Sequence, residues 1–387
     1  MGTGPDFDAT PAQLRAAGGY KWSLHPEAIG AFVAEMDFGT AEPVLRALHE
    51  TVERGPLGYL TAELENRLAT AWTGFARDRF GWDVAPERVR PLGDVIAGMQ
   101  AAVEHYSAPG SAVIVPTPAY MPFLYVPGEL GRRVIEVPLA RDGDRYVYDL
   151  DGLDAAFTAG GGLLLLCNPH NPVGRVLGTA ELLAVAEVVD RHGGRVFSDE
   201  IHAPLVFDGH RHVPYASLSP TTAGHTVTAV SASKAWNLPG AKCAQLVLSN
   251  DADAATWARV GRRFEHGVST LGVAANTAAY QHGVPWLEEV LAHLDGSRRL
   301  LADLLAEHVP AIGYTRPEGT YLAWLDCRRL GLGDHPATFF LEEAAVALTD
   351  GPACGRAGAG FVRHTLATPR PVIEATVRQM ADALARR

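Results

Sequence analysis

Short apolar runs alternate with amphipathic stretches through the middle of this 387-residue chain, and this alternation constrains its fold more than any other feature. Short apolar runs bounded by Pro, Gly or polar residues are typical of buried strands. Pro116 and Pro118 are expected to end the first strand, and Pro138 ends the second. The predicted strands cover residues 112–115, 134–137, 163–167, 196–199, 227–230 and 245–248.

A helical pattern separates the third predicted strand from the fourth. Thr179 is its expected N-terminal cap, and Gly193-Gly194 ends it. Strands that alternate with helices predict an α/β fold with a mainly parallel sheet.

The last third of the chain has a different pattern. Residues 286–306 and 372–387 are predicted helices, and residues 321–325 a predicted strand. A chain of this length usually forms two domains. We therefore expect an N-terminal segment (1–45) that packs with the small domain, a large domain (46–280) and a smaller α+β domain (281–387).

Composition excludes several classes of protein. The formal net charge is −11 and no arginine-rich block occurs, which argues against nucleic-acid binding. No apolar run approaches membrane-spanning length and no basic, apolar leader is present, so we expect a soluble cytoplasmic protein. The four cysteines lie far apart, and no His or Cys spacing is typical of a metal site.

Polar and aromatic side chains follow four of the predicted strands. Tyr120, Asn171, Asp199 and Lys234 come after successive strands, and Lys234 follows Asp199 by 35 residues, room for one further β–α unit. In parallel sheets, ligands bind beyond the carboxyl ends of the strands, so these groups are expected to meet. Lys234 is one of only three lysines in the chain.

These groups match the needs of pyridoxal phosphate. A lysine holds the cofactor's aldehyde as an imine, and a carboxylate keeps its pyridine nitrogen protonated so that the ring accepts electrons. A hydrogen-bond donor beside the phenolic oxygen and an aromatic ring on the pyridine face complete the set. The sequence therefore predicts a pyridoxal-phosphate site.

Four longer motifs carry a family resemblance. They are Asn-Pro-His-Asn-Pro-Val-Gly-Arg (168–175), Ser-Asp-Glu-Ile-His-Ala (198–203), Ser-Lys-x-x-Asn-Leu-x-Gly (233–240) and Glu-Gly-Thr-Tyr-Leu-Ala-Trp-Leu-Asp (318–326), with Lys21-Trp22 and residues 33–38 as earlier matches. The chain resembles fold-type I pyridoxal-phosphate enzymes of the class I/II aminotransferase superfamily. Within it, the chain resembles the MalY/PatB-like branch of cystathionine β-lyases and C–S lyases.

The resemblance implies a role for each candidate residue. Lys234 resembles the imine-forming lysine and Asp199 the partner of the pyridine nitrogen. Asn171 matches the residue that bonds the phenolic oxygen, and Tyr120 matches the stacking ring. His202 stands where aminotransferases carry a tyrosine, and histidine is usual there in the C–S lyase branch.

Further matches concern the phosphate and the substrate. Asp94-Val95 opens a predicted helix whose backbone amides would hold the phosphate. Ser231, Ser233 and Lys242 are other phosphate candidates, and Tyr59 resembles a tyrosine that reaches a phosphate across a dimer interface. Arg363 matches the arginine that binds the substrate carboxylate, to which Asn171 also contributes.

Other interpretations of these residues stay open. Tyr120 could be a packing aromatic, Ser231 and Ser233 could shape a turn, and Lys242 could be a solvated surface lysine. Arg363 could be one of many surface arginines, although its place in Gly360-Phe361-Val362-Arg363 favours the functional interpretation.

Three departures from the branch pattern stand out. Asp94 replaces a valine, Pro204 an aspartate, and His364-Thr365 a Leu-Asn pair. A carboxylate is unexpected beside a phosphate, and we expect the other changes to lie near the substrate pocket.

The resemblance implies a homodimeric C–S β-lyase that releases a thiol, pyruvate and ammonia from a cysteine S-conjugate or a cystathionine-like amino acid. The alternative is an aminotransferase, or a decarboxylating or deaminating enzyme of specialised metabolism. A regulator that contacts a transcription factor is a third possibility, which the net charge and the absence of an appended helix-turn-helix disfavour.

Overall fold

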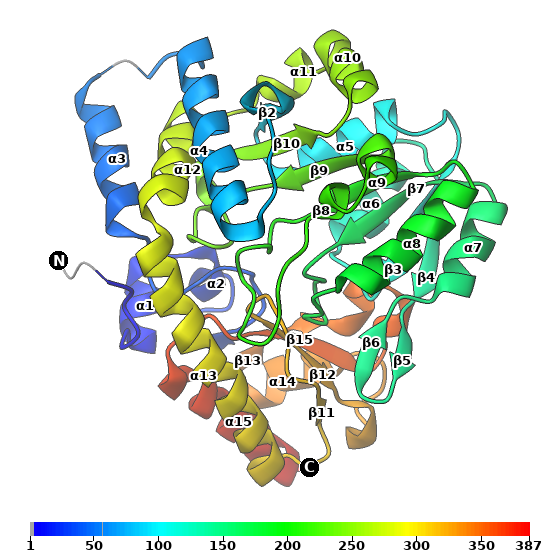
Figure 1. Ribbon diagram of the computed structural model, residues 1–387. Coiled ribbons are helices and arrows are strands. Elements are labelled where there is room, and N and C mark those ends of the chain that lie inside the picture. The colour runs from blue at the N-terminus through cyan, green and yellow to red at the C-terminus, as the bar shows by residue number, and fades with distance from the viewer. Residues whose placement is uncertain (1–3, 56) are drawn as a thin grey trace.

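A seven-stranded sheet lies at the centre of the large domain (Figure 1). The computed structural model describes residues 4–55 and 57–387, so small parts of the predicted segments 1–45 and 46–280 lie outside the described residues. In spatial order the strands are β2 (Val89–Leu92), β10 (Ala244–Leu248), β9 (Thr226–Val230), β8 (Arg195–Asp199), β7 (Gly161–Cys167), β3 (Ala112–Thr117) and β4 (Val134–Pro138).

The sheet is mainly parallel, as predicted. The pairs β3–β4, β3–β7, β7–β8 and β8–β9 are parallel, and only β10 runs antiparallel to its neighbours β9 and β2. All six predicted strands are present. The expected end of the first strand before Pro116 is wrong, because β3 continues to Thr117. Over its last residues β3 pairs with β4 alone, so a proline lacking an N–H is tolerated there.

Helices cover both faces of this sheet. Alternate residues of β7 point to opposite faces: Leu163 and Leu165 pack with α5 and α6, whereas Leu164 and Leu166 pack with α7 and α8. The helices of the chain up to this domain's end are α1 (Pro11–Ala17), α2 (Tyr20–Ser23), α3 (Glu42–Glu53), α4 (Ala62–Phe80), α5 (Val95–His105), α6 (Pro122–Glu129), α7 (Leu150–Thr158), α8 (Thr179–Arg191), α9 (Pro220–His225), α10 (Asp251–Val260), α11 (Arg262–Glu265) and α12 (Thr270–His282).

The predicted cap of α8 is off by one residue. Thr179 is the first helical residue and Gly178 is the cap. The Glu181 carboxylate accepts a hydrogen bond from the Gly178 N–H at 2.9 Å, the half of a capping box that the third helical residue supplies.

The small domain is built around a four-stranded sheet. Its order is β11 (Gly313–Tyr314), β12 (Leu322–Asp326), β15 (Phe361–Thr365) and β14 (Thr349–Asp350), and its helices are α13 (Val284–His308), α14 (Pro336–Ala344) and α15 (Arg370–Ala385). The N-terminal segment joins this domain through β1 (Ile29–Gly30), which pairs in parallel with β13 (Val346–Ala347). A hairpin of β5 (Ala140–Asp142) and β6 (Arg145–Val147) completes the strands. The three predicted segment boundaries stay predictions.

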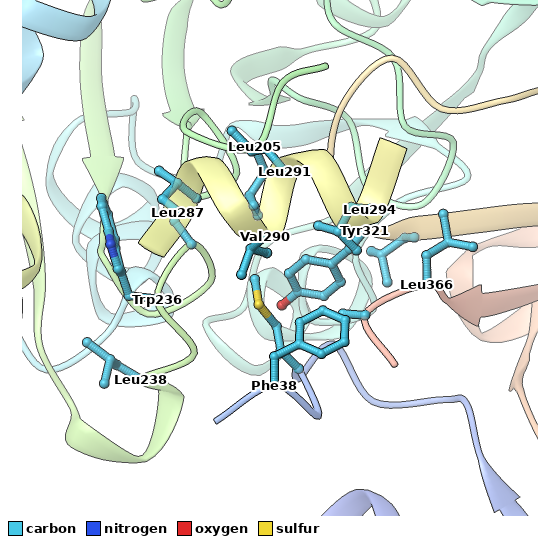
Figure 2. Close-up of a cluster of buried hydrophobic side chains, with 14 of the residues drawn as sticks. Phe38, Leu205, Trp236, Leu238, Leu287, Val290, Leu291, Leu294, Tyr321 and Leu366 are labelled. Carbon is cyan, nitrogen blue, oxygen red and sulfur yellow. The ribbon is translucent and has the colours of Figure 1, made fainter. Parts of the chain in front are cut away.

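A shared apolar core joins the two domains. The long helix α13 runs down one side of the molecule in Figure 1, from the large domain to α15. Figure 2 shows Val290 and Leu294 of α13 facing Tyr321, with Phe38 of the N-terminal segment beside the same tyrosine. Residues far apart in the sequence are therefore fixed against one another by apolar packing.

No helix in the described residues is both long enough and apolar enough to cross a membrane. All four cysteines are buried and free.

Candidate active site

A cavity of about 190 Å³ opens at the carboxyl ends of the parallel strands. Its walls bring together ten of the residues predicted from the sequence, which come from six separate places in the chain. They are Asp94, Val95, Tyr120, Asn171, Asp199, His202, Ser231, Ser233, Lys234 and Lys242. Ala34, Phe123 and Cys167 also line it. These groups therefore lie together, as expected from their positions after the ends of the parallel strands.

Lys234 lies in the turn after β9. Its Nζ donates a hydrogen bond to the Ala34 carbonyl at 2.9 Å. Burial, reinforced by the charge of Arg363, lowers the pKa of Lys234 from 10.5 to about 8. Much more of this lysine is therefore an unprotonated, nucleophilic amine near neutral pH than of a solvent-exposed lysine.

Asp199 is the last residue of β8 and is buried. Its Oδ1 accepts a hydrogen bond from the Ile201 N–H at 3.0 Å. Burial raises the pKa of Asp199 to about 7, and the neighbouring Glu200 carboxylate adds to the shift. A buried carboxyl group at the cavity wall is suited to a cationic ring nitrogen, which would restore its charged form.

Asn171 and Arg363 are joined directly. Arg363 Nη1 donates to Asn171 Oδ1 at 3.2 Å, and Nη2 donates to the Phe32 carbonyl at 2.8 Å. Arg363 lies on β15 and is 3% exposed, so the possibility that it is a surface arginine is excluded. A buried guanidinium beside a cavity-lining amide can bind a carboxylate that enters the cavity.

His202 stands on the cavity wall close to Tyr321, the two ring centroids being 5.8 Å apart. Burial lowers its pKa to about 3, and the charges of Lys234 and Arg363 contribute, so the imidazole is neutral. Its buried Nδ1 has no hydrogen-bond partner within the described part of the chain. A bound molecule could provide that partner.

The start of α5 also lines the cavity. Asp94 is the N-terminal cap, and its Oδ1 accepts from the Ala97 N–H at 2.9 Å. Its Oδ2 contacts Lys242 Nζ at 2.8 Å. The carboxylate that departs from the branch pattern is thus neutralised by an adjacent ammonium. A helix N-terminus with an ammonium beside it is a site for an anion such as a phosphate.

The two candidate serines differ in their bonding. Ser231 Oγ donates to the Cys243 carbonyl at 2.8 Å and accepts from the Ser233 N–H at 3.0 Å. Ser231 therefore shapes the turn, the alternative left open by the sequence, while both serines border the cavity. Tyr120 also borders it, and burial raises the pKa of its hydroxyl to about 12.

Tyr59 is not brought into this cavity. Its side chain is 88% exposed and borders a separate surface hollow between α3, α4 and α12. Within one chain Tyr59 is far too exposed to serve the cavity, so its predicted role requires a second chain.

Two of the sequence departures, which were expected near the substrate pocket, do not line this cavity. Pro204 borders a different hollow, which His212 and Arg211 also line. His364 is buried on β15, and its pKa is lowered to about 3 by burial and by the charge of Lys21. Alternation along β15 points Arg363 and His364 to opposite faces, so adjacency in sequence did not mean adjacency to the pocket.

Sequence reasoning missed two residues that shape the site. Tyr321 donates its hydroxyl hydrogen to the Ala34 carbonyl at 2.9 Å, the acceptor that Lys234 also uses. Asn237 binds Met36 on both sides, accepting from its N–H and donating to its carbonyl at 2.9 Å each. Both lie inside the motifs 318–326 and 233–240, which was the available signal.

The residues present fit pyridoxal phosphate. The cavity offers an amine with a lowered pKa, a buried carboxyl group, an unpartnered imidazole nitrogen, an aromatic ring and a helix N-terminus with a nearby ammonium. These groups match the aldehyde, ring nitrogen, phenolic oxygen, ring face and phosphate of that molecule.

Comparisons with known proteins agree with this geometry. The chain is 37% identical to the cystathionine beta-lyase of Corynebacterium glutamicum, over 94% of this chain and 96% of that one. It is 32% identical to the cystathionine beta-lyase PatB of Bacillus subtilis, with 92% and 93% covered. The crystal structure of cystalysin from Treponema denticola, which contains pyridoxal 5'-phosphate, matches with a TM-score of 0.91 at 28% identity, covering 99% of each chain.

The same comparisons place the chain in a family. The family described as aminotransferase class I and II matches residues 33–383, nearly the whole length. The sheet order, the strand-end lysine and the carboxyl group on the neighbouring strand are all present over this range. The chain belongs to the class I and II aminotransferase family, and within it is similar to C–S lyases of the MalY/PatB type.

Proposed function

We propose that this chain is a C–S β-lyase that cleaves a cysteine S-conjugate or a cystathionine-like amino acid. Its cofactor is pyridoxal phosphate. The observation that carries the proposal is the presence of Lys234, Asp199 and a neutral His202 in one cavity. His202 stands where the resemblance gives aminotransferases a tyrosine, and the relatives named cystathionine beta-lyase support the same choice.

Each residue has a defined task in this reaction. The bound cofactor supplies an electron sink for the bond that breaks at Cα. Arg363 binds the substrate carboxylate and so fixes the orientation of the Cα–H bond. Lys234, as a neutral amine, removes the Cα proton. Asp199 keeps the ring nitrogen protonated, so that the charge developing in the transition state is spread over the ring.

The overall chemistry balances with water as the only co-reactant. The Cβ–S bond breaks and its electron pair leaves on sulfur, which takes a proton to become a thiol. Hydrolysis of the remaining three-carbon unit gives pyruvate and ammonia. The lowered pKa of Lys234 suits this step, because a base with a pKa of about 8 can both accept and return a proton near neutral pH.

The test is an assay of the purified protein loaded with cofactor and given cystathionine, S-aryl-cysteines and cysteine. We expect pyruvate, ammonia and free thiol in equal amounts. Accumulation of pyridoxamine phosphate with transamination of added keto acids, and no pyruvate, would instead identify an aminotransferase.

We also propose that the active protein is a homodimer with sites at its interface. The exposed Tyr59 supports this, since its predicted phosphate contact needs a second chain. A two-fold interface would complete both sites at once. Sedimentation at assay concentration should give a dimer, whereas a fully active monomer would contradict the proposal.

A further inference from the structure

Residues 31–38 supply main-chain acceptors to the active site although they form neither helix nor strand. The Ala34 carbonyl accepts hydrogen bonds from Lys234 Nζ and from the Tyr321 hydroxyl, both at 2.9 Å. The Phe32 carbonyl accepts from Arg363 Nη2 at 2.8 Å. The positions of the proposed base and of the carboxylate-binding arginine therefore depend on where this segment lies.

Backbone and amide contacts hold the segment at its ends. The Thr365 N–H donates to the Ala31 carbonyl, and the Asp37 N–H donates to the Ala367 carbonyl, both at 2.9 Å. Asn237, three residues after Lys234, binds both the N–H and the carbonyl of Met36. Phe38 adds an apolar contact within the core shown in Figure 2.

Asp37 of this segment forms an ion pair with Lys21. Lys21 Nζ is 2.7 Å from Asp37 Oδ2, and the two side chains are only 2% and 5% exposed. The Trp22 indole N–H donates to Asp37 Oδ1 at 2.9 Å. Lys21 Nζ also donates to the Glu35 carbonyl at 3.4 Å, on the residue next to Ala34. One ammonium thus contacts the segment at two points, through a side chain and through the main chain.

The cost of burying charges argues against stabilisation of the fold as the main role of this ion pair. Removing two charges from water costs several kcal/mol for each ion, and a buried pair often contributes no more to stability than apolar residues of similar volume. A buried pair does impose one geometry on the groups it joins. Here the ammonium contacts Glu35 and Asp37, which follow Ala34, the residue whose carbonyl receives Lys234.

We propose that Lys21 and Asp37 are positioning residues of the active site. Their ion pair fixes residues 34–37 so that the Ala34 carbonyl receives the Lys234 amine whenever that amine is free of other bonds. In this geometry the amine is held at the cavity wall instead of rotating away. The catalytic part of this inference rests on the proposed role of Lys234, but the fixing of the segment does not.

The test compares three variants with the parent protein. Lys21→Met and Asp37→Asn each leave one charge buried without its partner, whereas the double variant Lys21→Met/Asp37→Asn removes both charges. Arg378→Met, which removes an exposed ion pair with Glu374 on α15, is the matched control. Three quantities are measured: the melting temperature, the rates of hydrogen exchange in residues 31–38 of the cofactor-free protein, and kcat and KM.

If the pair has a positioning role, the double variant should recover its stability, but residues 31–38 should not recover their fixed position. Each single variant should melt earlier, because it buries an unpaired charge. The double variant should regain most of the melting temperature, yet its residues 31–38 should exchange about tenfold faster than in the parent. Its kcat should fall about tenfold or more, with KM changed less, because the base is misplaced after substrate has bound.

Two results would overturn the inference. The first is a double variant with parental exchange rates and parental kcat, which would make the pair a stability feature alone. The second is faster exchange over the whole chain, which would indicate general loosening. If a single variant fails to fold, the double variant still decides between these outcomes. Absence of lyase activity in the parent protein would refute the proposed function, while the exchange rates would still test the positioning.

Discussion

The two sides of the candidate active site are built in different ways. On one side, Asn171, Asp199 and Lys234 follow the ends of neighbouring parallel strands, where Cys167 of β7 pairs with Asp199 of β8. We call this the sheet edge. On the other side, the irregular residues 31–38 offer the carbonyls of Phe32 and Ala34. We call this the N-terminal segment.

This difference shows two ways to place a functional group. The sheet edge presents side chains, and the ladder of backbone hydrogen bonds fixes where they lie. The N-terminal segment presents main-chain oxygens, which any residue carries, and buried polar contacts hold it in place. The sheet edge should therefore lose its function when a residue type changes. The N-terminal segment should lose its function when its position changes.

Lys234→Ala tests the sheet edge with the largest expected effect. Turnover should fall about a thousandfold or more, because alanine can neither bind the cofactor's aldehyde nor move the Cα proton. Hydrogen exchange in residues 31–38 should change much less, since Asn237, Tyr321 and the Lys21–Asp37 pair remain. Release of the whole segment in this variant would show that the two sides are not independent.

Arg363→Leu tests a side chain that contacts both sides. It bonds Asn171 on the sheet edge and Phe32 on the N-terminal segment. The kcat/KM for amino-acid substrates should fall about a hundredfold, the loss expected for a charge-assisted contact to the carboxylate. Arg363→Lys is the control, and it should recover only part of the loss because it lacks the planar fork. Parental kinetics in Arg363→Leu would remove it from the substrate site.

Much of the sheet edge could be predicted from the sequence. Six strands were located because strands buried on both faces are nearly continuous apolar runs. Polar residues that follow the parallel ones then had to meet at the carboxyl ends of those strands. The N-terminal segment could not be predicted in this way. Its functional atoms are carbonyl oxygens, and the contact between Asn237 and Met36 joins residues 201 positions apart without any periodic signal.

Smaller errors had local causes. Pro116 was expected to end a strand, but it lies where β3 pairs on one side only. His364 was expected near the substrate pocket; it does not line the cavity, and the alternation of β15 points it to the face opposite Arg363. The role predicted for Tyr59 stays a prediction, because a phosphate contact from this exposed position requires a second chain.

The pH dependence of cofactor capture sharpens the description of Lys234. Only the neutral amine attacks the aldehyde, and burial lowers the pKa of Lys234 to about 8. The capture rate of cofactor-free protein should therefore rise with pH and level off above about 8, not near 10.5. Stopped-flow absorbance across this range measures it. A rate still rising steeply at pH 10 would mean that Lys234 is not buried as described.

Lys242→Met has the smallest expected effect. It tests the difference between the exposed ion pair of Lys242 and the buried ion pair of Lys21. The Lys242–Asp94 pair is 60% and 40% exposed, whereas the Lys21–Asp37 pair is buried. Exposed pairs contribute at most about 1 kcal/mol, so the melting temperature should hardly change. Cofactor affinity, measured by titration, should weaken about fivefold through loss of one charge near the phosphate. A large drop in melting temperature would show that the Lys242–Asp94 pair also matters for stability and does not differ from the Lys21–Asp37 pair.

The attachment point of the cofactor tests the central claim most directly. The protein loaded with pyridoxal phosphate is reduced with borohydride, digested and mapped by mass spectrometry. With only three lysines in the chain, every alternative is covered by three peptides. The cofactor mass should appear on the peptide containing Lys234 and be absent from those containing Lys21 and Lys242. Attachment to Lys21 or Lys242, or retention of a reducible linkage in Lys234→Ala, would contradict the account.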